Sequence, residues 1–88
     1  MKVLARPIDV SAIFRGNGKI KPFKWHAEGT EGERHVITVD RVLSTEEDRK
    51  AGIKALIFNC TSIFEDGVER PYALKYRFEE HRWELYKI

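Results

Sequence analysis

The sequence has a single cysteine, Cys60, and this scarcity limits the chemistry that the chain can carry. One cysteine cannot close a disulfide within the chain or supply a zinc site made of several cysteines. No apolar run approaches the roughly 18 residues of a membrane-spanning helix, and the apolar stretch before Arg6 and Pro7 is too short for a signal peptide. We therefore expect a cytoplasmic protein with no membrane segment and no bound metal.

A strong excess of one charge is missing as well. The 88 residues include 16 Lys and Arg and 14 Asp and Glu, which gives a net charge of +2. This balance is typical of an ordinary soluble surface and differs from the basic excess of a dedicated nucleic-acid-binding protein, although it allows a local basic patch. A chain of this length predicts one domain, residues 1–88, with one small core and no room for a deep active site.

Alternation of apolar and polar residues is more frequent than helical periodicity, and turn signals separate the alternating runs. The runs that predict strands are residues 7–14, 19–26, 34–43, 53–64, 72–78 and 82–88. Gly16-Asn17-Gly18 and Asp66-Gly67 favour tight hairpins, whereas residues 27–33 predict a mobile loop. The expected fold is mainly β, with about six antiparallel strands in a twisted meander or a small open barrel or roll.

Residues 44–51 are the one stretch with a helical start, so the fold has at most one short helix. Ser44 followed by Glu47 fits a capping box, and acidic residues in a first turn suit the helix dipole. A charged loop is the alternative for this stretch.

Two positions interrupt the predicted strands. Pro22 has no N–H group and favours an edge strand or a bulge. Val42 is one residue out of phase with Ile37 and Val39, which a β-bulge near Asp40 and Arg41 would explain. The residues that lie in phase on separate strands predict the core: Ile37, Val39, Leu56, Phe58, Leu74 and Leu85.

Candidate catalytic residues are few. Cys60 and a histidine could form a thiolate dyad, but Cys60 is in phase with Phe58 on the most apolar strand, where a free cysteine behaves as a small hydrophobic residue. The histidines lack the short spacings that zinc sites favour: they are His26, His35 and His81. The runs of carboxylates fall in a predicted helix start and a turn, which rarely provide the apolar surroundings that acid–base chemistry needs. We expect neither an enzyme nor a cofactor.

Residues 19–26, KIKPFKWH, combine three lysines and a histidine with two aromatic residues. On a regular strand Phe23 and Trp25 share a face with Lys19 and Lys21, as on a stacking platform for single-stranded nucleic acid. We favour the alternative that Phe23 and Trp25 belong to the core, because the ten aromatic residues must supply most of the core of so small a domain. The lysines then join a basic rim. The candidate nucleic-acid-binding residues are Lys19, Lys21, Lys24, Arg34, Arg41 and Lys75.

Five motifs spread along the chain: F-x-W at 23–25, V-x-x-V-L at 39–43, LIFNCTS at 56–62, Y-x-L-x-Y at 72–76 and RWELYKI at 82–88. Together they resemble a family of small uncharacterised proteins from clostridia and related bacteria. The chain is more loosely similar to short domains of unknown function found near genes for translesion DNA polymerases. The resemblance implies a shared fold and no catalytic residues.

The sequence favours a non-enzymatic small β-barrel module that binds nucleic acid weakly and with little sequence preference. The basic rim would attract the phosphates, and an exposed aromatic residue would add stacking. The alternative is a protein–protein adaptor that offers an exposed edge strand, either the Pro22 strand or the first strand. A small enzyme is the third hypothesis.

Overall fold

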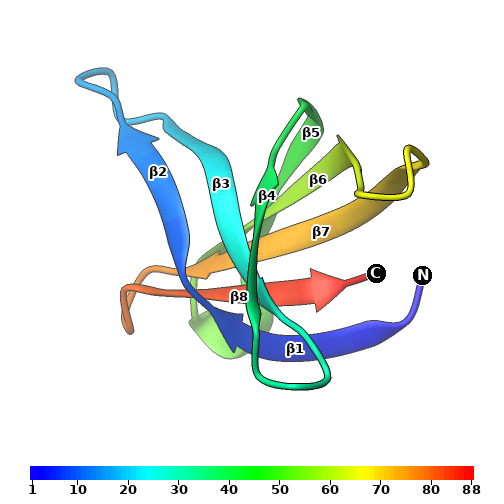
Figure 1. The fold of residues 1–88 in the computed structure, drawn as a ribbon. Helices are drawn as coiled ribbons and strands as arrows, with labels where there is room; N and C mark the ends of the chain where they lie inside the picture. Colours follow the sequence, from blue (N-terminus) through cyan, green and yellow to red (C-terminus); the bar gives the residue numbers. More distant parts are fainter.

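The computed structural model describes all 88 residues and contains eight antiparallel strands in two sheets (Figure 1). The strands are β1 (Val3–Ile8), β2 (Val10–Phe14), β3 (Ile20–Glu28), β4 (Arg34–Thr38), β5 (Arg41–Asp48), β6 (Ala55–Ile63), β7 (Glu69–Arg77) and β8 (Arg82–Lys87). The larger sheet has the order β1-β8-β7-β6-β5, and the smaller sheet has the order β2-β3-β4. The predicted mainly β class is confirmed, and both sheets stay open at their edge strands.

The number of strands is eight instead of six because two predicted strands divide between the sheets. The predicted strand at residues 7–14 leaves the larger sheet at Asp9, so that β1 and β2 form one bent segment (Figure 1). The predicted strand at residues 34–43 passes from the smaller sheet to the larger sheet at Val39 and Asp40, as β4 and β5. Asp40 secures this crossing, because its N–H donates to Thr61 O at 3.1 Å and its carboxylate accepts from the Ile63 N–H at 2.7 Å. The phase change predicted as a bulge near Asp40 is therefore a change of sheet.

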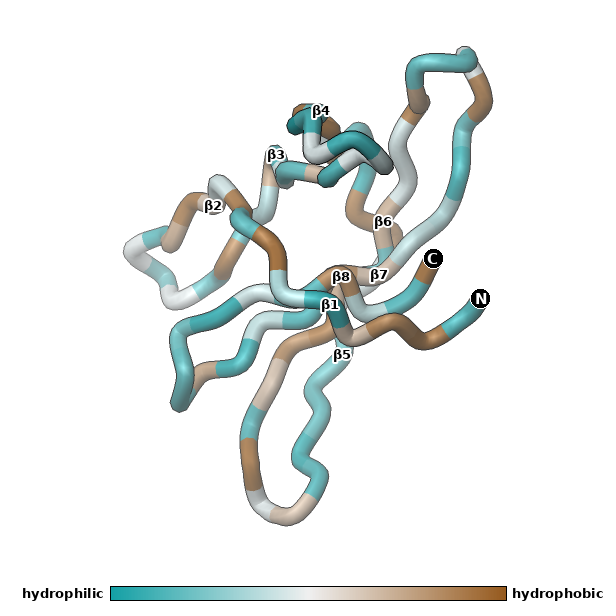
Figure 2. The backbone as a smooth tube through the Cα atoms, turned by 60° about the horizontal axis from the view of Figure 1, so that its bottom comes forward, coloured by the Kyte–Doolittle hydropathy of each residue, from teal (hydrophilic) through white to brown (hydrophobic).

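The core lies between the two sheets. Its buried members are Trp25, Ile37, Phe58, Cys60, Tyr72, Leu74, Tyr76, Trp83 and Leu85. Four of the six predicted core residues belong to this cluster, and the other two, Val39 and Leu56, are partly buried and pack against it. Figure 2 shows the contrast between the hydrophilic edge strand β5 and its more hydrophobic neighbour β6.

A bulge in β3 decides which side chains of residues 19–26 enter the core. Ser11 pairs with Lys24 and Ala12 pairs with Pro22, so Phe23 is an extra residue without a partner on β2. The alternation shifts by one position there, and Pro22 and Trp25 are both buried. The predicted common face for Lys21, Phe23 and Trp25 is therefore wrong. Burial of Trp25 in the core, at 1% exposure, is confirmed, whereas Phe23, also expected in the core, is only half-buried and lies outside the core cluster.

Pro22 tests the two alternatives that its missing N–H left open. It lies in β3, the central strand of the smaller sheet, so the edge-strand alternative is wrong. It is next to the bulge at Phe23, where a strand tolerates a residue that cannot donate a hydrogen bond.

Residues 44–51, for which the sequence left a short helix or a charged loop open, form neither over most of their length. Residues up to Asp48 form the edge strand β5, and a single 3-10 turn follows at Lys50–Gly52. Cross-strand bonds replace the capping box, because the Asn59 side-chain amide donates to Ser44 Oγ and to Glu46 Oε2, both at 3.0 Å. The structure has no helix with the length and apolar character needed to cross a membrane.

The predicted hairpin turns are confirmed. The Gly67 N–H donates to Phe64 O at 2.9 Å, and Gly67 has φ of 78°, a value that glycine adopts at little cost. The loop predicted at residues 27–33 is shorter than expected, since β3 extends to Glu28 and the Gly29 N–H donates to Glu33 O at 2.7 Å.

Phe58 tests the position of the core. Its side chain is 2% exposed, and its ring centroid lies 5.5 Å from that of Trp83. We expect Phe58→Ala to lower the free energy of unfolding by about 3–5 kcal/mol in urea denaturation. The matched control is Phe14→Ala, because Phe14 is 60% exposed and should lose only about 1 kcal/mol. Equal losses in the two variants would contradict this core.

Candidate nucleic-acid interface

Two exposed lysines of β3 lie on the side of the smaller sheet that faces away from the core, and a third, Lys19, precedes the strand beside a cavity that Leu56 and Phe58 also line. Lys21 and Lys24 are exposed on β3 because the bulge turns Pro22 and Trp25 inward, and Lys19 is exposed just before the strand. None of the three forms an ion pair. We call Lys19, Lys21 and Lys24 the basic face.

The residues beside the basic face carry no negative charge. Ile13 pairs with Lys21, while Ser11 and Thr38 flank Lys24 on the two neighbouring strands. The Lys24 ammonium lies 5.9 Å from the centroid of the half-buried Phe23 ring, a distance that allows a cation–π attraction. The ammonium groups of the basic face are therefore available to an anionic partner.

Arg34 and Arg41, two other residues of the predicted rim, are bound to acidic side chains. Arg34 Nη2 lies 2.5 Å from Asp9 Oδ2, and Arg41 Nη2 lies 3.1 Å from Glu69 Oε1. These pairs are exposed and screened by solvent, so each contributes little to stability. They nevertheless offset the two positive charges that the rim was expected to present.

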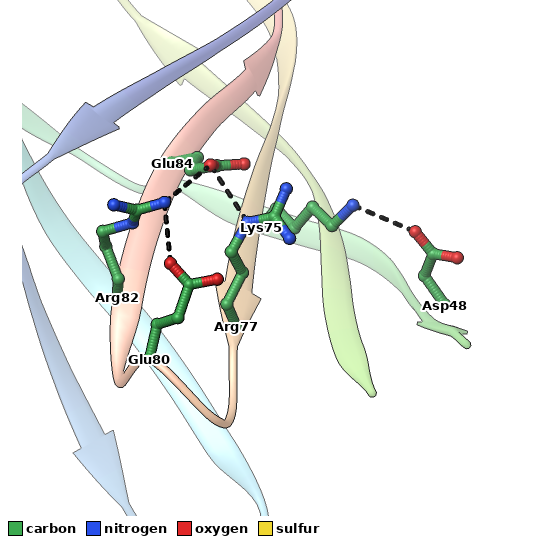
Figure 3. Close-up of polar contacts among 6 residues, drawn as sticks. All are labelled: Asp48, Lys75, Arg77, Glu80, Arg82 and Glu84. Carbon is green, nitrogen blue, oxygen red and sulfur yellow. Dashed lines mark hydrogen bonds and ion pairs between the residues drawn. The ribbon is translucent and has the colours of Figure 1, made fainter. Parts of the chain in front are cut away.

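Lys75 belongs to the larger sheet, on the face directed away from the core. Only 6% of the residue is exposed, and its ammonium donates to Asp48 Oδ2 at 3.0 Å (Figure 3). The same ammonium lies 4.8 Å from the centroid of the Tyr86 ring. The bond from Lys75 holds the pKa of the Asp48 carboxyl below its ordinary value. Lys75 therefore supports the sheet and is not part of the basic face.

A second group of charges occupies the same outer face of the larger sheet. Figure 3 shows the Glu84 carboxylate between two guanidinium groups. Arg77 Nε donates to Glu84 Oε2 at 3.0 Å, and Arg82 Nη2 lies 3.8 Å from that oxygen. Glu84 in turn raises the pKa of the Arg77 guanidinium. Sequence reasoning missed this group, although outward positions of opposite charge on the last two strands were a usable signal.

Cys60 is a core residue, as the sequence predicted. It is 1% exposed, and its thiol donates to Phe58 O at 3.4 Å. Burial raises the pKa of the Cys60 thiol to about 12, so the nucleophilic thiolate does not form near neutral pH.

The histidines that the sequence offered as isolated residues have polar neighbours. His35 lies between Glu33 and Glu65, at 3.6 and 3.2 Å, and His81 Nδ1 lies 3.2 Å from the Tyr76 hydroxyl. No group of three or more His, Cys, Asp or Glu side chains is arranged to hold a metal ion.

The burial of Cys60 predicts a pH effect. Because the folded chain keeps a thiol proton that the unfolded chain loses above pH 9.0, the free energy of unfolding should fall as the pH rises from 9 towards 12. The slope that Cys60 adds is at most about 1.4 kcal/mol per pH unit. The pH dependence of the free energy of unfolding, measured by urea denaturation, should differ between the wild type and Cys60→Ala by this slope. Burial also raises the pKa of Tyr72, but Tyr72 is present in both proteins, so its contribution cancels in the comparison. Rapid labelling of Cys60 by a thiol reagent in the folded protein would contradict this burial.

Lys75 predicts a second titration effect. In Lys75→Ala the pKa of Asp48 should rise towards its ordinary value of 3.8, because the ammonium donor is gone. A carbon-detected NMR titration of the carboxyl groups measures this change. The variant should also unfold more easily near neutral pH, and its difference from the wild type should shrink as acid protonates Asp48. Lys87→Ala is the control, since Lys87 lies over the same Tyr86 ring and makes no ion pair. Equal pKa changes in the two variants would contradict the assigned pair.

Comparison with known proteins finds no match, since no family model, no curated protein and no solved structure is significantly similar to the chain. The family resemblance drawn from the motifs therefore stays a prediction.

Proposed function

We propose that the protein is a non-enzymatic, cytoplasmic binding module whose basic face contacts the phosphates of single-stranded nucleic acid. The observation that supports this most is that Lys19, Lys21 and Lys24 follow one another along a short stretch of chain with no acidic partner, whereas Arg34, Arg41 and Lys75 are paired with acidic side chains. Free ammonium groups attract a polyanion, and binding gains free energy when the displaced counterions are released.

The positions of Lys21 and Lys24 support contact with an extended strand of nucleic acid. Both extend from one strand of a sheet, and because Phe23 is an extra residue between them they lie opposite Ser11 and Ile13, two positions apart on β2, which corresponds to roughly 7 Å along the strand. A rigid sheet holds its side chains at defined spacing, so the loss of conformational freedom on binding is smaller than for lysines on a loop.

Stacking contributes less than the sequence suggested. Trp25 is buried under the sheet and Phe23 is half-buried, so neither ring offers a full exposed face. Phe14 is the one largely exposed aromatic ring near the β2–β3 turn, at 60% exposure, and it packs against Tyr76 in a T-shaped arrangement with ring centroids 5.7 Å apart. Binding that depends on phosphate contacts alone discriminates poorly between sequences. The proposed binding is accordingly weak and tolerant of sequence.

The basic face predicts a salt dependence. Fluorescence anisotropy with a labelled oligothymidylate should show affinity falling linearly with salt on logarithmic axes, with about 0.7 units of slope for each neutralised phosphate. Lys21→Gln combined with Lys24→Gln should reduce the slope by about 1.4 units, since two phosphate contacts are lost. The fold should persist because both side chains are exposed.

The matched control is Lys2→Gln combined with Lys50→Gln. These lysines are also exposed and free of ion pairs, but they flank strands of the larger sheet, and the variant has the same net charge. It should retain the wild-type slope. No binding at low salt would remove nucleic acid as the partner, and an equal change in both variants would show that only net charge matters.

A further inference from the structure

The outer edge of β4 has backbone groups that no strand pairs. In the smaller sheet β4 pairs with β3 alone. The Val39 N–H donates to Phe23 O at 2.9 Å, so His35, Ile37 and Val39 direct their backbone groups to β3. Alternate residues of an antiparallel strand direct theirs to the opposite side. Arg34, Val36 and Thr38 therefore present N–H and C=O groups on the free edge.

One contact verifies this direction and marks where the free edge ends. The Thr38 carbonyl accepts a hydrogen bond from Ser62 Oγ at 2.6 Å, so it points away from β3 towards the end of β6. Next to it, Asp40 binds Thr61 and Ile63 through its backbone and its side chain. The edge is closed at Thr38 and open from Val36 towards Arg34.

Two adjoining cavities of about 350 Å³ each lie along this free edge. Both are lined by Ile37, Phe64 and Glu65, and so they form one groove between β4 and the β6–β7 hairpin. One cavity extends to His35 and Arg70, and the other extends to Val36 and Ile63. We call this the edge groove. Its volume suits single side chains of an extended peptide rather than a large ligand.

The rim of the edge groove is apolar and uncovered. Val36 is 56% exposed and Ile63 is 60% exposed, and both line the second of the two cavities. Proteins normally protect a free strand edge with lysine, proline or a bulge. β4, with the sequence RHVIT, has none of these around Val36. Exposed aliphatic side chains beside an unprotected edge are typical of a strand-pairing surface.

The charges of the groove select the partner. Asp40, Glu65 and Asp66 line it, against one arginine, Arg70, which is bound to Asp66 through both guanidinium nitrogens. Glu65 is 83% exposed at its side chain and lies 3.2 Å from His35. The groove therefore has an acidic lining, which attracts a basic segment and repels nucleic acid. A second copy of the chain would bring the same acidic groups together.

We propose that the edge groove binds an extended segment of a partner protein in which aliphatic residues alternate with lysine or arginine. The segment adds to β4 as a fourth strand of the smaller sheet, its backbone pairing with Val36 and its aliphatic side chains entering the groove. Its basic side chains meet Glu65 and Asp40. This makes the edge-strand adaptor hypothesis specific to β4, and it does not depend on the basic face.

The test uses two synthetic seven-residue peptides with blocked ends. One alternates valine with lysine or arginine, and the other has glutamate in place of each basic residue. In a titration of the isotope-labelled protein followed by NMR, the basic peptide should shift the amide signals of Val36, Thr38 and Ile63 and leave those of Lys19 and Lys21 in place. The glutamate peptide should cause no such shifts. Shifts confined to another surface, or equal binding of the two peptides, would overturn the proposal.

Variants separate the backbone and charge contributions. Val36→Pro removes the outward N–H without removing a hydrogen bond to β3. This variant should lower the affinity for the basic peptide at least tenfold. Val36→Thr keeps the N–H and the branched shape, so it should stay within about threefold of the wild type. Glu65→Lys alters an exposed side chain that the fold does not need. It should lower the affinity for the basic peptide about tenfold and raise the affinity for the glutamate peptide.

Further readouts distinguish this proposal from the nucleic-acid proposal and from self-association. Oligothymidylate binding should be the same in Val36→Pro and in the wild type, because none of the three lysines of the basic face lines the edge groove. Unchanged peptide affinity in both Val36→Pro and Glu65→Lys would exclude the edge groove. A concentration-dependent dimer in sedimentation that Val36→Pro does not form would show that a second copy of the chain pairs with the free edge of β4. This result would overturn the peptide proposal.

Discussion

The bulge at Phe23 is the constraint on which both the core and the basic face depend. A single unpaired residue reverses the alternation of β3, so Pro22 and Trp25 both face the larger sheet. Trp25 then lies with its ring centroid 5.3 Å from that of Tyr72, which joins the smaller sheet to the larger one. Without the bulge, Trp25 would share a face with Lys21, and burying one side chain would expose or desolvate the other.

The two crossings between the sheets create the second surface. At Asp40 the chain leaves the smaller sheet after only a short β4, and nothing pairs with the strand's outer edge. The Ser62 hydroxyl holds this corner closed, since it donates to Thr38 O while lying 2.6 Å from the Tyr72 hydroxyl. Further along, the edge groove lies between β4 and the β6–β7 hairpin, lined by residues of both. The groove therefore follows from an incomplete sheet of three strands.

The net charge of the chain is small, but positive and negative side chains are distributed unevenly over its surface. On the outer face of the larger sheet, acidic and basic side chains meet in pairs such as Asp48–Lys75 and Arg77–Glu84 (Figure 3). Such pairs satisfy charges that the close-packed strands partly desolvate. The lysines of the basic face stay unpaired, and the edge groove has an acidic lining. One small domain thus presents two surfaces of opposite charge without a large net charge.

The sequence by itself determined the mainly β class, the hairpin turns at Gly18 and Gly67, and the burial of Phe58, Leu74 and Cys60. These features depend on alternation and turn chemistry, which are local properties. Only the tertiary structure decided the bulge at Phe23, the change of sheet at Asp40 and the strand at 44–48, because register depends on pairing with residues distant in sequence. For the same reason Lys75, which reads as a surface lysine, is buried against Asp48: Asp48 ends β5, two strands away from β7, and only the order of strands in the sheet brings the two side chains together.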